Sequence, residues 1–92
     1  AAARVGRRLA LALGPRIRVN GIAPGPILPP PGKGEDYLRD HAGAMPLEKR
    51  SDEDDLARAL LYLLDAPAVT GQILYVDSGQ HLLGNALNGQ EA

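Results

Sequence analysis

The sequence predicts an α/β fold in which two strands lie parallel in one sheet. Residues 1–13 are patterned as an amphipathic helix, and a short link joins them to a β-branched strand over residues 17–22, which together make half of a βαβ unit. Residues 73–76 form a nearly continuous apolar run, typical of a strand covered on both faces, as parallel strands are. The predicted order is helix, strand, loop with a short helix, helix, strand.

The first helix is predicted from composition and spacing. Residues 1–13 are rich in Ala, Leu and Arg, and Val5, Leu9 and Leu13 recur one turn apart on one face. The Gly14-Pro15 pair should end the helix, because Gly permits a left-handed cap and Pro cannot continue the hydrogen-bond ladder. The chain opens in helix-favouring composition without Met or a capping residue. We therefore expect it to be a piece of a larger protein.

A Pro-rich segment follows the first strand. Residues 24–34 hold five of the eight Pro and three Gly, so neither helix nor strand is expected there. A patterned strand enters the segment and a patterned helix follows it, which favours a stiff loop that closes over a site. The alternative is a Pro-rich linker or a polyproline ligand. Residues 35–41 can form a short helix, in which Tyr37 and Leu38 are the only sizeable apolar side chains.

The clearest helix signals lie between residues 51 and 65. Ser51 is the expected N-cap, with Asp54 three residues on as a capping-box variant. The acidic residues 52–55 place negative charge at the positive end of the helix dipole, which favours helix-start chemistry over a metal site. The expected buried stripe, which Leu61 widens, consists of Leu56, Leu60, Leu63 and Leu64.

Composition excludes several classes of function. The net charge of −1 argues against nucleic acid or an anionic membrane as partner. The absence of Cys excludes disulfides and thiolate metal sites. No apolar run approaches the roughly 20 residues of a membrane span. Five Arg precede the first acidic residue, and we interpret them as a solvated helix face, with a phosphate or RNA patch as the alternative: Arg4, Arg7, Arg8, Arg16 and Arg18.

Three motifs, in the right order, resemble the short-chain dehydrogenase/reductase family. Residues 18–25 are similar to the family's Arg-Val-Asn-x-Ile/Val-x-Pro-Gly strand and loop. Residues 46–50 resemble its Pro-Leu-x-Arg segment, with Glu48-Lys49 in place of the usual Gly-Arg. Residues 70–79 resemble its Thr-Gly-x-x-x-x-Val-Asp-Gly-Gly ending, with Ser78 in place of the first Gly. The resemblance implies that residues 1–83 are the carboxyl-terminal part of a Rossmann-type doubly wound parallel sheet, followed by a polar tail over 84–92.

The activity implied by this resemblance is hydride transfer between NADP (or NAD) and a carbonyl or pteridine-type imine carbon. The family's catalytic Tyr-x-x-x-Lys is absent, since none of the three Tyr has a Lys four residues on, and alignment of the first helix places it just before Ala1. The Gly-rich dinucleotide fingerprint is absent as well. We therefore expect no catalytic residue in this chain, which alone should be inactive.

The resemblance also implies which residues form the site. Pro24 and Gly25 would shape the turn under the nicotinamide, and the backbone N–H and C=O of Ile27 would hold the carboxamide. Pro26 and Leu28 complete this cofactor-binding loop, although the Leu28-Pro29-Pro30 run removes a Thr hydroxyl contact that the family often has. The candidate substrate contacts, which could equally pack on their own loop, are Tyr37 and Leu38. Asn20 is expected to be a structural hydrogen bonder within the sheet.

The implied partners are the nicotinamide cofactor, a small-molecule substrate, the remainder of the family domain and further copies of the protein. The helix over 1–13 and the last helix and strand are the expected interfaces of a cytoplasmic dimer or tetramer. Residues 24–31 and 79–82 resemble the pteridine reductase branch of the family. The alternative is a non-catalytic fragment of the family that serves assembly. The isolated chain, with its apolar strands uncovered, should aggregate or stay molten and should not bind NADPH saturably.

Overall fold

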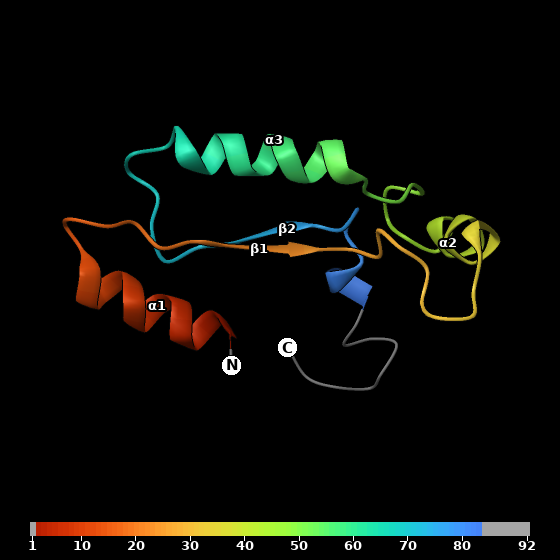
Figure 1. The fold of residues 1–92 in the computed structure, drawn as a ribbon, viewed down its shortest axis with the longest axis horizontal. Helices are drawn as coiled ribbons and strands as arrows, with labels where there is room; N and C mark the ends of the chain where they lie inside the picture. The colour runs from red at the N-terminus through yellow and green to blue at the C-terminus, as the bar shows by residue number, and fades with distance from the viewer. Residues whose placement is uncertain (1, 84–92) are drawn as a thin grey trace.

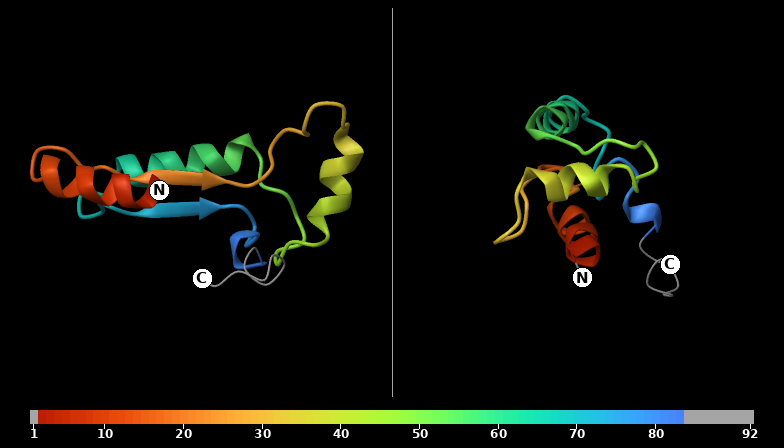
Figure 2. Two further views of the ribbon diagram at one scale, coloured as in Figure 1. Left: turned by 90° about the horizontal axis from the view of Figure 1, so that it is seen from below. Right: turned by 90° about the vertical axis from the view of Figure 1, so that its right-hand side faces the viewer.

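The computed structural model describes residues 2–83 and has the predicted α/β architecture. Its elements are α1 (Ala2–Leu13), β1 (Gly21–Pro24), α2 (Glu35–Ala42), α3 (Glu53–Leu64) and β2 (Ile73–Val76). The two strands pair in parallel, with Gly21 opposite Ile73 and Pro24 opposite Val76. Helix α3 packs against both strands, α1 lies on the opposite side of the sheet, and α2 lies beyond the carboxyl ends of both strands (Figure 1, Figure 2).

The first strand begins later than the sequence predicts. Residues 17–20 are not part of the sheet, because their polar groups bond to the loop before β2 instead of to a neighbouring strand. The Val19 N–H donates to Thr70 Oγ1 at 3.0 Å, and the Val19 carbonyl accepts from the Gly71 N–H at 2.7 Å. The β ladder therefore starts only at Gly21, and the strand extends through Pro24.

Helix α1 has the predicted extent, but its expected apolar face is not buried by the described residues. Val5 and Leu9 are exposed, and Ala10 is the buried position of this helix. Ala10 packs close to Gly71 of the loop before β2. The prediction of a left-handed Gly14 is wrong: its N–H donates to the Ala10 carbonyl at 3.1 Å as in a helix, so no special conformation is needed there.

Helix α3 is capped one residue later than predicted. Asp52 is the N-cap, its side chain accepts from the Asp55 N–H, and the Asp55 carboxylate accepts from the Asp52 N–H, both at 3.0 Å. The hydrogen bond from the Asp55 N–H is the main cause that lowers the pKa of the Asp52 carboxyl. The acidic run is thus helix-start chemistry, as expected. Ser51 is instead buried, and its hydroxyl has no hydrogen-bond partner among residues 2–83.

The buried face of α3 also differs from the prediction. Ala59 and Leu63, one turn apart, face the strands. The helical rotation that turns these two inward carries the other leucines outward, because they lie on an adjacent face. Three members of the predicted stripe are accordingly exposed: Leu60, Leu61 and Leu64. Sequence patterning identified the apolar residues of the helix but not which of its two apolar faces meets the sheet.

Arg18 does not belong to a solvated face, contrary to the prediction. Its guanidinium donates to carbonyl oxygens at and just beyond the carboxyl end of α3, at 2.7 Å to Leu63, 2.9 Å to Ala66, 3.2 Å to Leu64 and 3.3 Å to Val69. A cation at this end also interacts favourably with the helix dipole. Arg18 therefore ties the extended segment before β1 to the end of α3.

Strand β2 has the predicted bounds and ends in a tight turn at residues 77–81. Residues 80–83 then form a helical turn, in which the Leu82 N–H donates to the Gly79 carbonyl and the Leu83 N–H donates to the Gln80 carbonyl. The predicted polar tail, residues 84–92, lies outside the described residues. Across residues 2–83, the longest helices are too short and too polar to cross a bilayer.

Candidate functional site

The candidate cofactor loop, residues 24–28, begins where β1 ends. Its first bond extends the sheet, since the Gly25 N–H donates to the Val76 carbonyl at 3.1 Å. Beyond it the chain leaves the sheet, with Pro26 and Ile27 half-buried and Leu28 74% exposed. In open α/β sheets, ligands bind just past the carboxyl ends of the strands. The loop thus lies where a ligand site is expected.

Gly25 is enclosed by two later segments of the chain. A Cβ built on it would lie 3.1 Å from the Cα of Asp77 and 3.2 Å from the Oγ of Ser51. Its φ is not in the left-handed region, so close approach, and not backbone conformation, is what favours Gly at this position. Asp77, just after β2, and Ser51, two residues before α3, therefore form the wall behind the loop.

Ile27 presents an unused donor and acceptor. Within residues 2–83, neither its N–H nor its C=O makes a hydrogen bond. A primary carboxamide has one acceptor and two donors, and a paired backbone N–H and C=O satisfy such a group. The backbone of this loop therefore has the chemistry that the carboxamide of a nicotinamide requires.

The two candidate substrate residues on α2 have different environments. Leu38 is 1% exposed, the most buried side chain in the described chain, which favours the packing alternative for this residue. Tyr37 is half-buried, and the Nζ of Lys33 lies 6.0 Å from the centre of its ring. Tyr37 is the one of the two that a ligand could contact without rearrangement of the helix.

Helix α2 is joined to the segment before α3 by one ion pair. The Arg50 guanidinium lies 2.7 Å from the Glu35 carboxylate. Both side chains are partly exposed, so the pair contributes about 0–1 kcal/mol. The helix is also held by its buried Leu38 and by Met45, which is buried in the following turn.

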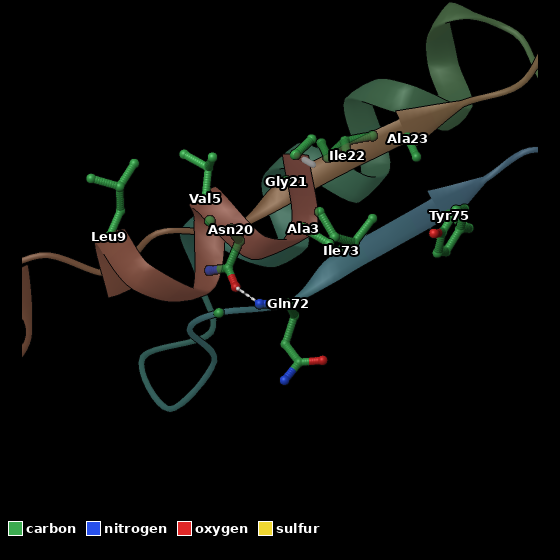
Figure 3. A pocket seen from close by; sticks show the side chains of 13 residues that line it. Ala3, Val5, Leu9, Asn20, Gly21, Ile22, Ala23, Gln72, Ile73 and Tyr75 are labelled. Atoms are coloured by element: carbon green, nitrogen blue, oxygen red, sulfur yellow. Dashed lines mark hydrogen bonds between the residues drawn. The ribbon is translucent and has the colours of Figure 1, made fainter. Parts of the chain in front are cut away.

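Asn20 is a structural hydrogen bonder, as the sequence predicts, although it lies just before the sheet and not within it. Its side-chain amide donates to the Val69 carbonyl at 2.9 Å, and its Oδ1 accepts from the Gln72 N–H at 3.0 Å (Figure 3). The side chain thus replaces two rungs of the sheet where the loop before β2 diverges. This fixes the start of both strands and hence the register that aligns their carboxyl ends.

A groove of about 530 Å³ lies between α1 and the sheet and is lined largely by apolar groups. Figure 3 shows the side chains that line it. Val5 and Leu9 border it from the helix, and Ile73 and Tyr75 border it from β2. It reaches Ala23 but none of residues 24–28. The groove is therefore separate from the candidate cofactor loop.

One part of the region was missed by sequence reasoning. The Asp77 carboxylate accepts from the N–H groups of Gly79 and His81 and from the His81 ring. Burial acts to raise the pKa of the Asp77 carboxyl, but the hydrogen bonds from His81 and Gly79 outweigh burial and leave the pKa lowered. The available signal was an Asp at the end of an apolar run, two residues before a Gly and four before a His.

The fold and the loop at the ends of parallel strands place this chain in the α/β class of nucleotide-binding architectures. A family model described as enoyl-(acyl carrier protein) reductase matches residues 1–81. The chain belongs to the short-chain dehydrogenase/reductase family, as its motifs indicated.

Curated relatives are similar over most of this chain. A putative ketoacyl reductase of granaticin polyketide synthesis from Streptomyces violaceoruber is 41% identical in an alignment of 81 positions that covers 84% of this chain and 32% of the relative. The short-chain dehydrogenase/reductase homolog YusR of Bacillus subtilis is 38% identical over 77 residues, 83% of this chain and 60% of the relative. The chain thus spans between a third and three fifths of these two relatives.

Solved structures agree with the fold. FolM alternative dihydrofolate reductase 1 from Brucella canis, complexed with NADP, is 42% identical with a TM-score of 0.75. The Brucella suis protein of the same name, also with NADP, is 38% identical with a TM-score of 0.81. Each covers 87% of this chain, which corresponds to 31% and 32% of those chains.

Proposed function

We propose that this chain forms the nicotinamide side of the cofactor pocket of an NAD(P)H-dependent oxidoreductase. The observation that carries the proposal is the free N–H and C=O of Ile27 in a loop just past the carboxyl ends of two parallel strands. Two structures similar to this one, both FolM proteins, are complexes with NADP. The Tyr and Lys of the family pattern would belong to the remainder of the domain.

In this proposal the residues of the chain bind and orient. When bound, the reduced nicotinamide supplies the hydride. The Ile27 backbone would hold the carboxamide and so fix which face of the ring meets the substrate. The half-buried Pro26 would pack under the ring, and α2 would cover the site and exclude water, with Tyr37 toward the substrate. Proton transfer would be carried out by the Tyr and Lys of the family pattern, and residues 1–92 contain no Tyr-x-x-x-Lys motif.

A pteridine-type imine is the substrate we favour. Both FolM proteins, at 42% and 38% identity, are named as alternative dihydrofolate reductases. The motifs at residues 24–31 and 79–82 resemble the pteridine reductase branch. Ketoacyl and enoyl thioesters, named for other relatives, are the competing substrates.

The first test follows NADPH and NADH oxidation by the intact protein with dihydrofolate, an unconjugated dihydropterin, a β-ketoacyl thioester and an enoyl thioester. We expect turnover with at least one pterin. Turnover of a thioester alone would contradict the proposed pteridine-type substrate but support the proposed oxidoreductase activity. No turnover with any of these substrates would overturn both proposals.

The second test changes the carboxamide contact. Ile27→Pro removes the backbone N–H in a loop that is already Pro-rich, and Leu28→Ala is the control that keeps every backbone donor. Loss of one neutral hydrogen bond should raise the NADPH dissociation constant by up to about tenfold. Equal affinities for both variants and the wild type would contradict the role of Ile27.

A second candidate is an assembly role, and an exposed face of α3 favours it. Residues spaced as i, i+3, i+4 and i+7 make a continuous apolar stripe on the outer side of this helix: Ala57, Leu60, Leu61 and Leu64. A stripe of this spacing fits another helix, so we propose it as a contact between copies of the protein. The test is the mass in solution: Leu61→Glu should lower the oligomeric state, whereas Tyr62→Glu, on a different face, should not.

The remainder of the family domain is the proposed occupant of the groove in Figure 3. Its lining of apolar groups from α1 and β2 is what a further layer of a doubly wound sheet would cover. The isolated 92-residue chain should accordingly bind an apolar dye and melt without cooperativity. A sharp melt of a soluble monomer would contradict this.

A further inference from the structure

The turn at residues 77–81 contacts both segments that border the candidate site. On one side, the main chain of Asp77 packs against Gly25 of the cofactor loop. On the other, the Ser78 carbonyl accepts from the Leu47 N–H at 3.1 Å, and Gly79 packs so closely on Pro46 that a Cβ would lie 2.9 Å from its ring. One short turn therefore sets the position of the cofactor loop relative to the segment that returns from α2.

The turn is held from inside by one carboxylate. Asp77, of which 6% is exposed, accepts from the Gly79 N–H at 3.1 Å and from the His81 N–H at 2.9 Å. The Nδ1 of His81 lies 3.0 Å from each carboxylate oxygen. The His81 ring in turn stacks on Tyr75, with ring centres 4.1 Å apart and planes inclined by 16°. The imidazole is therefore fixed between a strand residue and a buried anion.

The turn needs this support because its backbone is strained. Ser78 has a φ of 56° and Gly79 a φ of 87°. A non-glycine residue in the left-handed region costs about 1–2 kcal/mol and persists where the surroundings over-determine it. The hydrogen bonds to the Asp77 carboxylate span both of these residues, and so they supply that constraint.

We propose that His81 is a positioning residue, which acts through the Asp77 carboxylate to fix the turn and thereby the Gly25 loop and the 46–47 segment. This inference rests on the proposed cofactor role of the loop. Within residues 2–83, the hydrogen bonds of the His81 ring go to Asp77, so its effect passes through Asp77 and the strained turn. Removing the imidazole would loosen both flanking contacts together and weaken cofactor binding more than it slows the chemical step.

The test compares three variants of the intact protein. His81→Ala removes the ring donor, His81→Gln restores a side-chain N–H that can reach the carboxylate, and Leu63→Ala destabilises the buried face of α3 away from the turn. We expect His81→Ala to raise the NADPH dissociation constant and KM roughly fivefold to tenfold, in line with partial loss of a hydrogen bond to a charged group, with kcat within about twofold. His81→Gln should bind NADPH almost as the wild type does, and Leu63→Ala should lower Tm without this change.

Hydrogen exchange gives a second readout that needs no cofactor. The N–H groups of Gly25 and Leu47 are bonded to Val76 and Ser78, and both should exchange faster in His81→Ala but not in Leu63→Ala. Unchanged exchange at these two amides would overturn the inference, as would equal NADPH affinity of His81→Ala and the wild type, or failure of His81→Gln to restore it. A wild-type protein that does not bind NADPH would overturn the proposed function and the affinity effect, while the exchange result would still decide the coupling.

Discussion

Replacement of Gly25 by Ala should disturb the candidate cofactor loop through the wall behind it. The new methyl group would lie 3.1 Å from the Cα and 3.2 Å from the Cβ of Asp77, and 3.2 Å from the Oγ of Ser51. Carbon atoms in good contact are about 3.5–4.0 Å apart. Asp77 cannot withdraw easily, because its carboxylate is held by Gly79 and His81. We therefore expect the loop, and not the wall, to move.

The magnitude follows from two opposed effects. Gly25 is not in the left-handed region, so Ala can adopt its backbone, and the reduced freedom of the unfolded chain stabilises the protein by about 0.4–1 kcal/mol. Forcing an extra methyl group into a packed site costs about 1–3 kcal/mol. The net loss of unfolding free energy should be about 1–2 kcal/mol. A displaced loop should also raise the NADPH dissociation constant roughly tenfold.

Urea denaturation and NADPH titration of the intact protein measure the two effects. Gly34→Ala is the matched control, because a Cβ there meets nothing within 4 Å and its φ is not left-handed. That variant should be unchanged in cofactor affinity and equal or slightly higher in stability. If Gly25→Ala behaves as Gly34→Ala does, the inferred contact between the loop and the Asp77 turn is wrong.

Three further predictions test the supports of the site. Arg18→Ala should lower the unfolding free energy by about 2–3 kcal/mol in urea, because four carbonyls lose a charged donor, and Arg16→Ala should change little. Ser78→Gly should raise stability by about 0.5–1 kcal/mol, since relief of left-handed strain exceeds the entropy that Gly adds, and a lower Tm would contradict this. The lowered pKa of Asp77 stabilises the fold above the unfolded carboxyl pKa of about 3.9, and this contribution is lost as pH falls through the folded value. Asp77→Asn should therefore flatten the acid limb of a stability–pH profile, and an unchanged limb would count against the pairing with His81.

The elements of the fold were largely predictable because each carries a local signal. Local patterns predict the secondary structure of the residues that carry them. These patterns are the periodic apolar residues of α1 and α3, the acidic start of α3 and the apolar run of β2. The start of β1 was not predictable, since it depends on whether residues 17–20 meet a strand or the loop at residues 69–72. The buried face of α3 was also mispredicted, because it depends on which side of the helix packs against the distant strands.

The candidate site divides in a similar way. Resemblance located residues 24–28, but it did not point to the Asp77–His81 pair, whose local signal, the spacing of Asp, Gly and His, was overlooked. Glu48 and Ser78 stand at positions where the family pattern has Gly. They are also the residues other than Gly that have a positive φ in the described chain. The backbone has kept the conformation that the family's Gly permits, and the side chains have to be accommodated in it.

The paired residues of β1 and β2 are separated by some fifty residues in the sequence. The hydrogen bonds of Arg18 and Asn20 join residues that are about as far apart. Partners so distant in the sequence pair late, because closing a long loop costs entropy before any contact repays it. During synthesis, the backbone N–H and C=O groups on the β2-facing edge of β1 would therefore remain unpaired until β2 had left the ribosome. Mutations that delay this meeting should reduce the yield of folded protein in cells even where they leave its final stability unaltered.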